Sequence, residues 1–294
     1  MPKNRKPADL KPSPLVARLN AQSDGNSFAF IYLTNECQLG CAHCSFQSGP
    51  GYSHTRIDGS LLLRAIEELK GIRDITISGG EPMLHPDFRT ILHKAAQQAR
   101  VVYVLSNGIS LVGKNSITAL ARRNDLRGLK KKLRTALDDL PDHVHILFPL
   151  DTFHLRAFRR YDFFLEGLSA VVRERERLRL KPALGFLSNE VSPRISDELI
   201  KRFSVASCTH RGTALFAPWR KSKTVQEWYY SHPLNRRPFA GGVYINYKGV
   251  YLNEASLLMD LREGIATDLK IGMLSNAPGE HNQLERVYRR ALFF

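Results

Sequence analysis

The chain has 294 residues, of which 43% are hydrophobic and 24% charged, and its mean hydropathy is -0.27. These values are typical of a globular protein with one large or two ordinary domains, and they exclude a mainly disordered or membrane-embedded chain. Lys and Arg total 43 against 28 Asp and Glu, which gives a formal net charge of +15. This excess favours an acidic partner such as nucleic acid, a phosphorylated metabolite or an acidic peptide.

The N-terminal residues differ in composition from the rest of the chain. Residues 1–26 are rich in Pro, Lys, Asn and Ser and lack a periodic apolar face, so we expect a disordered basic tail there. They contain no apolar core of a secretory signal, and no stretch approaches the roughly 20 apolar residues of a membrane span. The four cysteines are too few for a disulfide scaffold. We therefore expect a cytoplasmic protein without membrane segments.

From residue 27 onward, short apolar runs alternate with amphipathic segments. Patterns typical of strands occupy 28–33, 74–78, 101–106, 143–150 and 183–187, with a sixth strand near 208. Helical periodicity occupies 60–70, 87–98, 163–179 and, as one or two helices, 116–140. This alternation predicts an α/β fold whose parallel sheet is curved into a barrel or part of one. Ligands are then expected at the carboxyl ends of the strands.

The pattern changes beyond about residue 217. Alternating residues on both sides of 246–249 predict a hairpin, and the remaining chain is less regular. We therefore expect a core at 27–217 and a C-terminal α+β extension at 218–294, which packs on the sheet and covers the mouth of the barrel.

Three of the four cysteines lie within eight positions. Cys37, Cys41 and Cys44 follow the first predicted strand with the spacing C-x3-C-x2-C. Thiolates are soft ligands that favour iron-sulfur clusters, Zn²⁺ or Cu(I). Three thiolates on a 4Fe-4S cluster would leave one iron open to a substrate, as catalytic metal sites do. Spacing alone equally permits a structural zinc site with His43 or His54 as the fourth ligand.

Two further motifs follow the next two predicted strands. They are Gly79-Gly80-Glu81-Pro82, after the second strand, and Ser106-Asn107, at the end of the third. With the cysteine spacing, these motifs resemble those of the radical S-adenosylmethionine (SAM) superfamily over residues 27–217. The resemblance implies a partial (β/α)6 barrel and a 4Fe-4S cluster on the three cysteines, with the SAM amino and carboxylate groups on the fourth iron. It also implies reductive cleavage of SAM to a 5'-deoxyadenosyl radical, which abstracts hydrogen from the substrate.

The same resemblance assigns the motif residues to SAM binding. Glycines at 79 and 80 allow the backbone to approach a ligand closely, and Glu81 can balance the ammonium group of SAM. In isolation, however, this segment is also typical of an ordinary turn. Ser106 occupies a position where Thr is commoner, and both offer a hydroxyl. His43 occupies the position of an aromatic residue near the adenine, where an imidazole can still stack.

Later strand ends supply five weaker candidates. The family places polar residues that contact the SAM ribose where Asp151 lies, and His154 can face the substrate as an acid or base. Alternatively, Asp151 caps the next helix and His154 is a surface residue. Leu187 and Ser188 end a strand that contacts the adenine in the family, unless it is a plain core strand. Cys208 either donates a hydrogen atom to a substrate radical, as in some peptide epimerases of the family, or is a small buried residue.

The sequence therefore predicts a single-cluster radical SAM enzyme, because no cysteine follows Cys208 to hold an auxiliary cluster. The resemblance implies an electron donor such as flavodoxin or ferredoxin. We expect a peptide or natural-product intermediate as substrate, with a nucleotide, nucleotide sugar or RNA as the alternative that the charge favours. Basic residues at 127–134 are compatible with an RNA or phosphate patch, but no recognised nucleic-acid module accompanies them. The competing class is a zinc-stabilised basic binding protein without catalysis.

Overall fold

A single nine-stranded sheet lies at the centre of the protein. The computed structural model describes residues 10–44, 46, 48–188, 190, 192–205, 208–210, 242–251, 270–272, 274 and 284–285. The strand order is β6-β5-β4-β3-β2-β1-β7-β8-β9. The strands are β1 (Phe28–Tyr32), β2 (Ile72–Ser78), β3 (Ala99–Leu105), β4 (Val144–Pro149), β5 (Ala183–Ser188), β6 (Cys208–His210), β7 (Gly242–Asn246), β8 (Gly249–Tyr251) and β9 (Lys270–Gly272).

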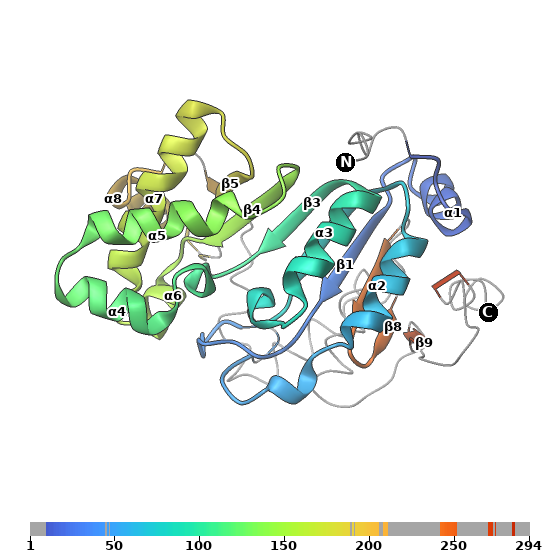
Figure 1. Cartoon of the computed structure of the whole chain (residues 1–294), viewed down its shortest axis with the longest axis horizontal. Coiled ribbons are helices and arrows are strands. Elements are labelled where there is room, and N and C mark those ends of the chain that lie inside the picture. The colour runs from blue at the N-terminus through green and yellow to red at the C-terminus, as the bar shows by residue number, and fades with distance from the viewer. Residues whose placement is uncertain are drawn as a thin grey trace.

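Helices connect the parallel strands and lie along the sheet in two groups (Figure 1). They are α1 (Pro14–Gln22), α2 (Gly59–Glu68), α3 (Phe88–Gln98), α4 (Lys114–Arg122), α5 (Leu126–Asp138), α6 (Thr152–Ala157), α7 (Tyr161–Leu178) and α8 (Pro193–Arg202). Neighbouring strands from β1 to β6 are consecutive in the chain and pair in parallel. This is the order of a partial (β/α)6 barrel, as the sequence predicts.

The core forms where the apolar faces of the helices cover the strands. In α5 the buried residues Leu129, Leu133 and Leu137 recur every four positions, which places one apolar stripe against α7. The predicted strands and helices of the core are found with small shifts at their ends, and the segment 116–140 forms two helices. No helix in this described part is long and apolar enough to cross a membrane.

The expected disordered tail is wrong for the part of residues 1–26 that the structure describes. Helix α1 occupies 14–22, and Leu15, Val16 and Leu19 are buried against the core. The Ser13 hydroxyl accepts a hydrogen bond from the Val16 N–H and caps this helix, with Pro14 at its first position. Three apolar residues make only a short stripe, which a search for long periodic faces misses. Residues 1–9 lie outside the described residues.

The predicted hairpin is confirmed, but its place in the fold differs from our expectation. Strands β7 and β8 pair antiparallel, and the Asn246 side chain accepts hydrogen bonds from the N–H groups of Lys248 and Gly249 in the turn. Strand β7 also pairs in parallel with β1. Residues 242–251 therefore extend the sheet beyond β1 instead of packing on its face. The boundary expected at 217 lies outside the described residues, and coverage of the barrel mouth stays a prediction.

Candidate functional site

The loops that follow β1, β2 and β3 meet at the carboxyl ends of these strands. Asn107, after β3, lies between the other two loops. Its side-chain amide donates hydrogen bonds to Cys37 Sγ (3.5 Å) and Gln38 Oε1 (3.2 Å), and its backbone N–H donates to Glu81 Oε2 (2.8 Å). One residue thus joins the cysteine loop to the Gly-Gly-Glu-Pro segment, which local sequence patterns cannot reveal.

The three cysteines of the C-x3-C-x2-C loop are free thiols, with Cys37 and Cys41 buried and Cys44 half-buried. Cys37 Sγ accepts a hydrogen bond from the Leu39 N–H (3.4 Å), and Cys44 Sγ accepts one from the Ser48 N–H (3.3 Å). Burial, with the nearby charges of Glu81 and the other two thiols, raises the pKa of Cys37 well above its ordinary value. A bound metal centre would reverse this effect, because it stabilises thiolates directly.

The donor set of this loop fits an iron-sulfur cluster. Three soft thiols lie on one loop at the strand ends, and Leu39, Asn107 and Ser48 donate hydrogen bonds to two of their sulfurs. A 4Fe-4S cluster binds each cysteine on a different iron, and hydrogen bonds to the sulfurs tune its potential. A structural zinc site would need a fourth protein ligand. His54 is exposed and its ring faces Tyr52 at 6.0 Å.

Glu81 is fully buried at the end of β2 and ties that loop to the loop after β3. Its carboxylate accepts hydrogen bonds from the Ser106 hydroxyl (2.8 Å) and from the N–H groups of Asn107 (2.8 Å) and Met83 (3.1 Å). Burial raises the pKa of Glu81 to about 7, against the opposing effect of these three hydrogen bonds. The carboxylate therefore gains or loses its proton near neutral pH, where an ammonium group would favour the charged form.

The glycines of this segment permit close packing against the chain itself. A Cβ added at Gly79, where φ is +147°, would lie 2.5 Å from the Thr34 carbonyl oxygen, and one at Gly80 would lie 2.4 Å from the Glu36 carbonyl oxygen. The N–H of Glu81 donates to the Glu36 oxygen at 2.8 Å. Glycine is required here because the segment lies against the backbone that leads into the cysteine loop. Pro82 is buried and begins a short 3-10 turn, Pro82–Leu84.

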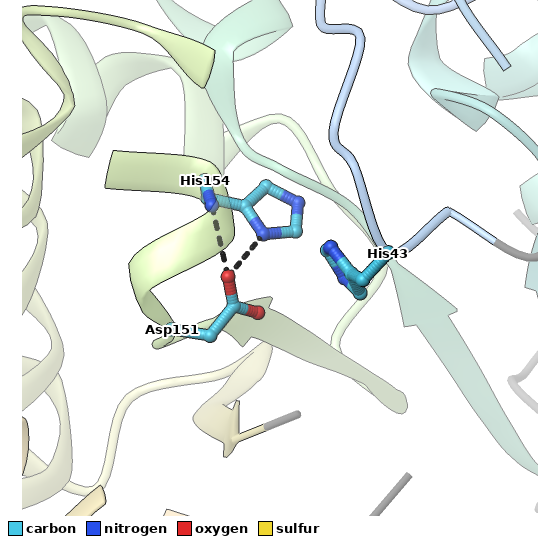
Figure 2. A group of neighbouring side chains, drawn as sticks. All are labelled: His43, Asp151 and His154. Atoms are coloured by element: carbon cyan, nitrogen blue, oxygen red, sulfur yellow. Dashed lines mark hydrogen bonds and ion pairs between the residues drawn. The ribbon is translucent and has the colours of Figure 1, made fainter. Parts of the chain in front are cut away.

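Asp151 and His154 form a buried pair at the start of α6 (Figure 2). Asp151 Oδ1 accepts hydrogen bonds from the His154 backbone N–H (2.9 Å) and from His154 Nδ1 (2.8 Å). Asp151 therefore caps α6, as one sequence alternative predicted. His154 is not a surface residue, because only 14% of its side chain is exposed. Its ring also forms a hydrogen bond with the Cys41 thiol.

The charges of this pair stabilise each other. Burial by itself would raise the pKa of Asp151, but the charge and hydrogen bonds of His154 outweigh burial and lower this pKa below its ordinary range. Burial would likewise lower the pKa of His154, but Asp151 and the Cys41 thiol raise it well above its ordinary value. The protein thus holds a charged imidazole next to the cysteine loop. This group can hold or supply a proton at that position.

His43, from the cysteine loop, faces this pair (Figure 2). Its ring centroid lies 5.3 Å from that of His154 and 4.4 Å from that of Phe153. The ligand atoms of His43, Asp151 and His154 all lie within 4.8 Å of one another. The structure therefore brings the predicted adenine neighbour together with the predicted ribose and substrate residues.

Two other predicted residues lie at the end of β5, and one lies on β6. Leu187 is largely buried, and its carbonyl accepts a hydrogen bond from the Leu150 N–H. The fully buried Ser188 hydroxyl is hydrogen bonded to the Ser196 hydroxyl of α8 at 2.6 Å. These contacts are those of a core strand. Cys208 begins β6, but its side chain lies outside the described residues.

Two buried residues connect the strand ends in ways that the sequence analysis missed. The Tyr161 hydroxyl lies 3.1 Å from the Asn107 carbonyl oxygen and 3.4 Å from that of Pro149, which joins the ends of β3 and β4. Glu190, after β5, accepts a hydrogen bond from the Thr152 N–H in the first turn of α6. Neither residue belongs to a recognisable motif. Glu190 contacts a residue 38 positions away, and Tyr161 contacts residues 54 and 12 positions away.

The fold and the site together define a partial α/β barrel with a three-cysteine loop, suited to an iron-sulfur cluster, at its strand ends. Residues 31–163 match the family model of the Radical SAM superfamily. Residues 31–163 are therefore a domain of this superfamily, whose members are enzymes with a 4Fe-4S cluster and SAM as cofactors. The predicted family, fold class and cofactors are therefore confirmed.

Two curated proteins of Bacillus subtilis (strain 168) resemble part of the chain. The antilisterial bacteriocin subtilosin biosynthesis protein AlbA is 31% identical over 131 residues, which are 41% of this chain and 26% of AlbA. The sporulation killing factor maturation protein SkfB is 32% identical over 82 residues, which are 27% of this chain and 20% of SkfB. The chain thus matches about a quarter of the length of AlbA and a fifth of the length of SkfB.

Solved structures resemble the chain at low identity. Streptococcus suis SuiB bound to the precursor peptide SuiA is 13% identical, with a TM-score of 0.47 over 86% of this chain and 65% of SuiB. Native anSMEcpe with bound AdoMet and Cp18Cys peptide is 10% identical, with a TM-score of 0.43 over 90% of this chain and 82% of that protein.

Glu81 predicts a specific pH dependence of stability. The folded chain keeps the Glu81 proton up to about pH 7, whereas the unfolded chain loses it near the ordinary pKa of 4.5. The contribution of Glu81 to the free energy of unfolding is therefore largest below pH 4.5, and about 3 kcal/mol of it is lost as the pH rises through 7. Urea unfolding of the wild type and Glu81→Gln at several pH values measures this difference. Parallel pH profiles of the two proteins would contradict the prediction.

Proposed function

We propose that this enzyme cleaves SAM reductively and abstracts a hydrogen atom from a peptide substrate. The observation that carries the proposal is one connected set of contacts at the strand ends. Cys37 contacts Asn107, which binds Glu81, and Cys41 contacts His154, which binds Asp151. The cluster ligands and the groups expected to bind SAM are therefore adjacent. When bound, the cluster would supply one electron to SAM, so that its C5'–S bond breaks to give methionine and a 5'-deoxyadenosyl radical, which would take a hydrogen atom from the substrate.

Each residue of the set has a role that its environment supports. Cys37, Cys41 and Cys44 would hold the cluster, with hydrogen bonds to two of their sulfurs of the kind that tune cluster potential. Glu81 would balance the ammonium group of SAM, since a buried carboxylate gains stability from a cation. Asp151 would accept hydrogen bonds from the ribose, and the ring of His43 would lie near the adenine.

The names of the relatives support a peptide substrate. AlbA is named for the biosynthesis of a bacteriocin and SkfB for the maturation of a killing factor, and bacteriocins are peptides or small proteins. The proposed residues all lie at the carboxyl ends of the strands, where the barrel can separate a reactive group from water. A peptide enters such a site with one residue and leaves the rest of its chain on the surface.

Deuterium transfer tests both parts of this proposal. The anaerobically reconstituted enzyme is incubated with SAM and dithionite, and 5'-deoxyadenosine is measured with and without peptides encoded beside its gene, in deuterated form. We expect 5'-deoxyadenosine that carries deuterium from one of these peptides. Deuterium transfer only from RNA or a nucleotide would overturn the peptide substrate. A colourless zinc protein without affinity for SAM would overturn the activity itself.

A further inference from the structure

Much of the excess positive charge lies on one pair of neighbouring helices. Between residues 114 and 139, eight Lys and Arg accompany only three Asp. All three acidic residues have partners other than these basic side chains. Asp125 caps α5, Asp138 pairs with Arg175, and Asp139 pairs with Arg89. The acidic residues of these helices therefore leave most of the basic charge uncompensated.

Six basic residues of α4, α5 and the turn between them are exposed and form no ion pair within the part of the chain that the structure describes. We call them the basic face: Lys114, Arg122, Arg123, Arg127, Lys131 and Lys132. The apolar stripe of α5 packs inward against α7, so the basic side chains of α5 lie on its outer side. Helices α4 and α5 lie next to each other at the edge of the molecule farthest from the described ends of the chain (Figure 1).

One end of the basic face contacts the cysteine loop. The Lys114 ammonium donates a hydrogen bond to the Gln38 carbonyl oxygen at 3.3 Å and lies 5.4 Å from the centre of the Phe158 ring. Gln38 directly follows Cys37 in the sequence. The positive charge thus begins beside the proposed cluster ligands and continues outward along α4 and α5. A partner that contacts Lys114 would lie beside the cysteine loop.

We propose that the basic face docks an acidic carrier protein that delivers one electron to the cluster. The inference rests on the proposed function, because reductive cleavage of SAM requires one electron from outside the enzyme. In this step the carrier is oxidised by one electron and the cluster is reduced by one, and no bond or proton is transferred. Complexes between redox partners bury small interfaces and are short-lived, and complementary charge mainly increases the rate at which the partners associate.

The position of the basic face favours an electron carrier over the other polyanions that positive charge attracts. A peptide substrate must reach SAM inside the barrel, and an RNA substrate must do the same. An electron carrier needs only to approach the cluster from outside. The contact between Lys114 and the cysteine loop meets this requirement.

A comparison of two reductants tests the docking surface. Dithionite is a small molecule that needs no docking site, whereas flavodoxin is an acidic one-electron carrier protein. The test variant is Arg127→Glu/Lys131→Glu/Lys132→Glu, and the control is Arg100→Glu/Arg177→Glu/Lys201→Glu, which makes the same charge change at exposed residues elsewhere. Formation of 5'-deoxyadenosine is measured with dithionite, and with flavodoxin kept reduced by its reductase and NADPH. Binding of fluorescently labelled flavodoxin is measured separately by anisotropy.

We expect all three proteins to have equal rates with dithionite. At low ionic strength, the flavodoxin-driven rate and flavodoxin affinity should fall about tenfold or more in the test variant and stay near wild type in the control. Added salt should reduce the flavodoxin-driven rate of the wild type toward that of the test variant. Unchanged flavodoxin binding and rate in the test variant would overturn the inference. So would a selective loss of RNA or peptide binding.

The separate binding measurement distinguishes the two proposals. If wild type forms no 5'-deoxyadenosine with dithionite but binds flavodoxin through the basic face, the proposed reaction fails and the docking surface stands. If dithionite supports the reaction but the test variant binds flavodoxin as tightly as wild type does, the docking surface fails and the reaction stands.

Discussion

Cys41→Ala is expected to abolish both cluster assembly and the formation of 5'-deoxyadenosine. The proposed cluster has three protein ligands, so the loss of one leaves two irons without a protein ligand. Iron content after anaerobic reconstitution should fall from about four per chain to below one, and 5'-deoxyadenosine should fall below detection with SAM and dithionite. Iron and sulfide analysis, the visible absorption of the cluster and product assay by mass spectrometry measure these changes.

Cys41 also contacts His154, so a second variant must separate ligand loss from loss of this contact. Cys41→Ser keeps a polar group near the His154 ring but replaces the soft thiolate with a hydroxyl, and it should fail like Cys41→Ala. His93→Ala, at an exposed position of α3, removes a potential metal ligand far from the motif and should assemble the cluster normally. A catalytically active Cys41→Ala protein would exclude the C-x3-C-x2-C loop as the cluster site.

Asp151→Asn is expected to weaken SAM binding by about 10- to 100-fold and to destabilise the fold by about 3 kcal/mol. The affinity change corresponds to the loss of a charge-assisted hydrogen bond. The stability change arises because His154, whose side chain is only 14% exposed, would lose its carboxylate partner. Asn caps a helix about as well as Asp, so loss of the cap does not account for the effect. Equilibrium dialysis with SAM and urea unfolding measure the two quantities.

Asp125→Asn is the matched control for this variant. Asp125 caps α5 by accepting a hydrogen bond from the Gly128 N–H, so the chemical change and the local role are the same. It lies away from the site, and both stability and SAM affinity should stay near wild type. If Asp151→Asn behaves like Asp125→Asn, then Asp151 acts only as a helix cap.

The sequence by itself determined the order of the elements and the identity of the cluster loop. Strands such as 74–78 and 183–187 are short apolar runs between turn residues. Because these patterns are local, they can be recognised without knowledge of the fold. The spacing of Cys37, Cys41 and Cys44 is also local. Because parallel strands bring their carboxyl ends to one edge, the order of motifs along the chain was enough to predict where they would meet.

Only the tertiary structure decided how those strand ends are connected. Glu81 binds Ser106 and Asn107 across 25 and 26 positions, and the Tyr161 hydroxyl reaches the Asn107 carbonyl across 54 positions. Hydrogen bonds between distant segments leave no periodic or compositional pattern in the sequence. The tertiary structure also showed that Asp151 caps α6 and contacts His154 at once, whereas the sequence analysis treated capping and function as alternatives. One carboxylate oxygen can accept two hydrogen bonds, so a local role and a site role coexist in the same side chain.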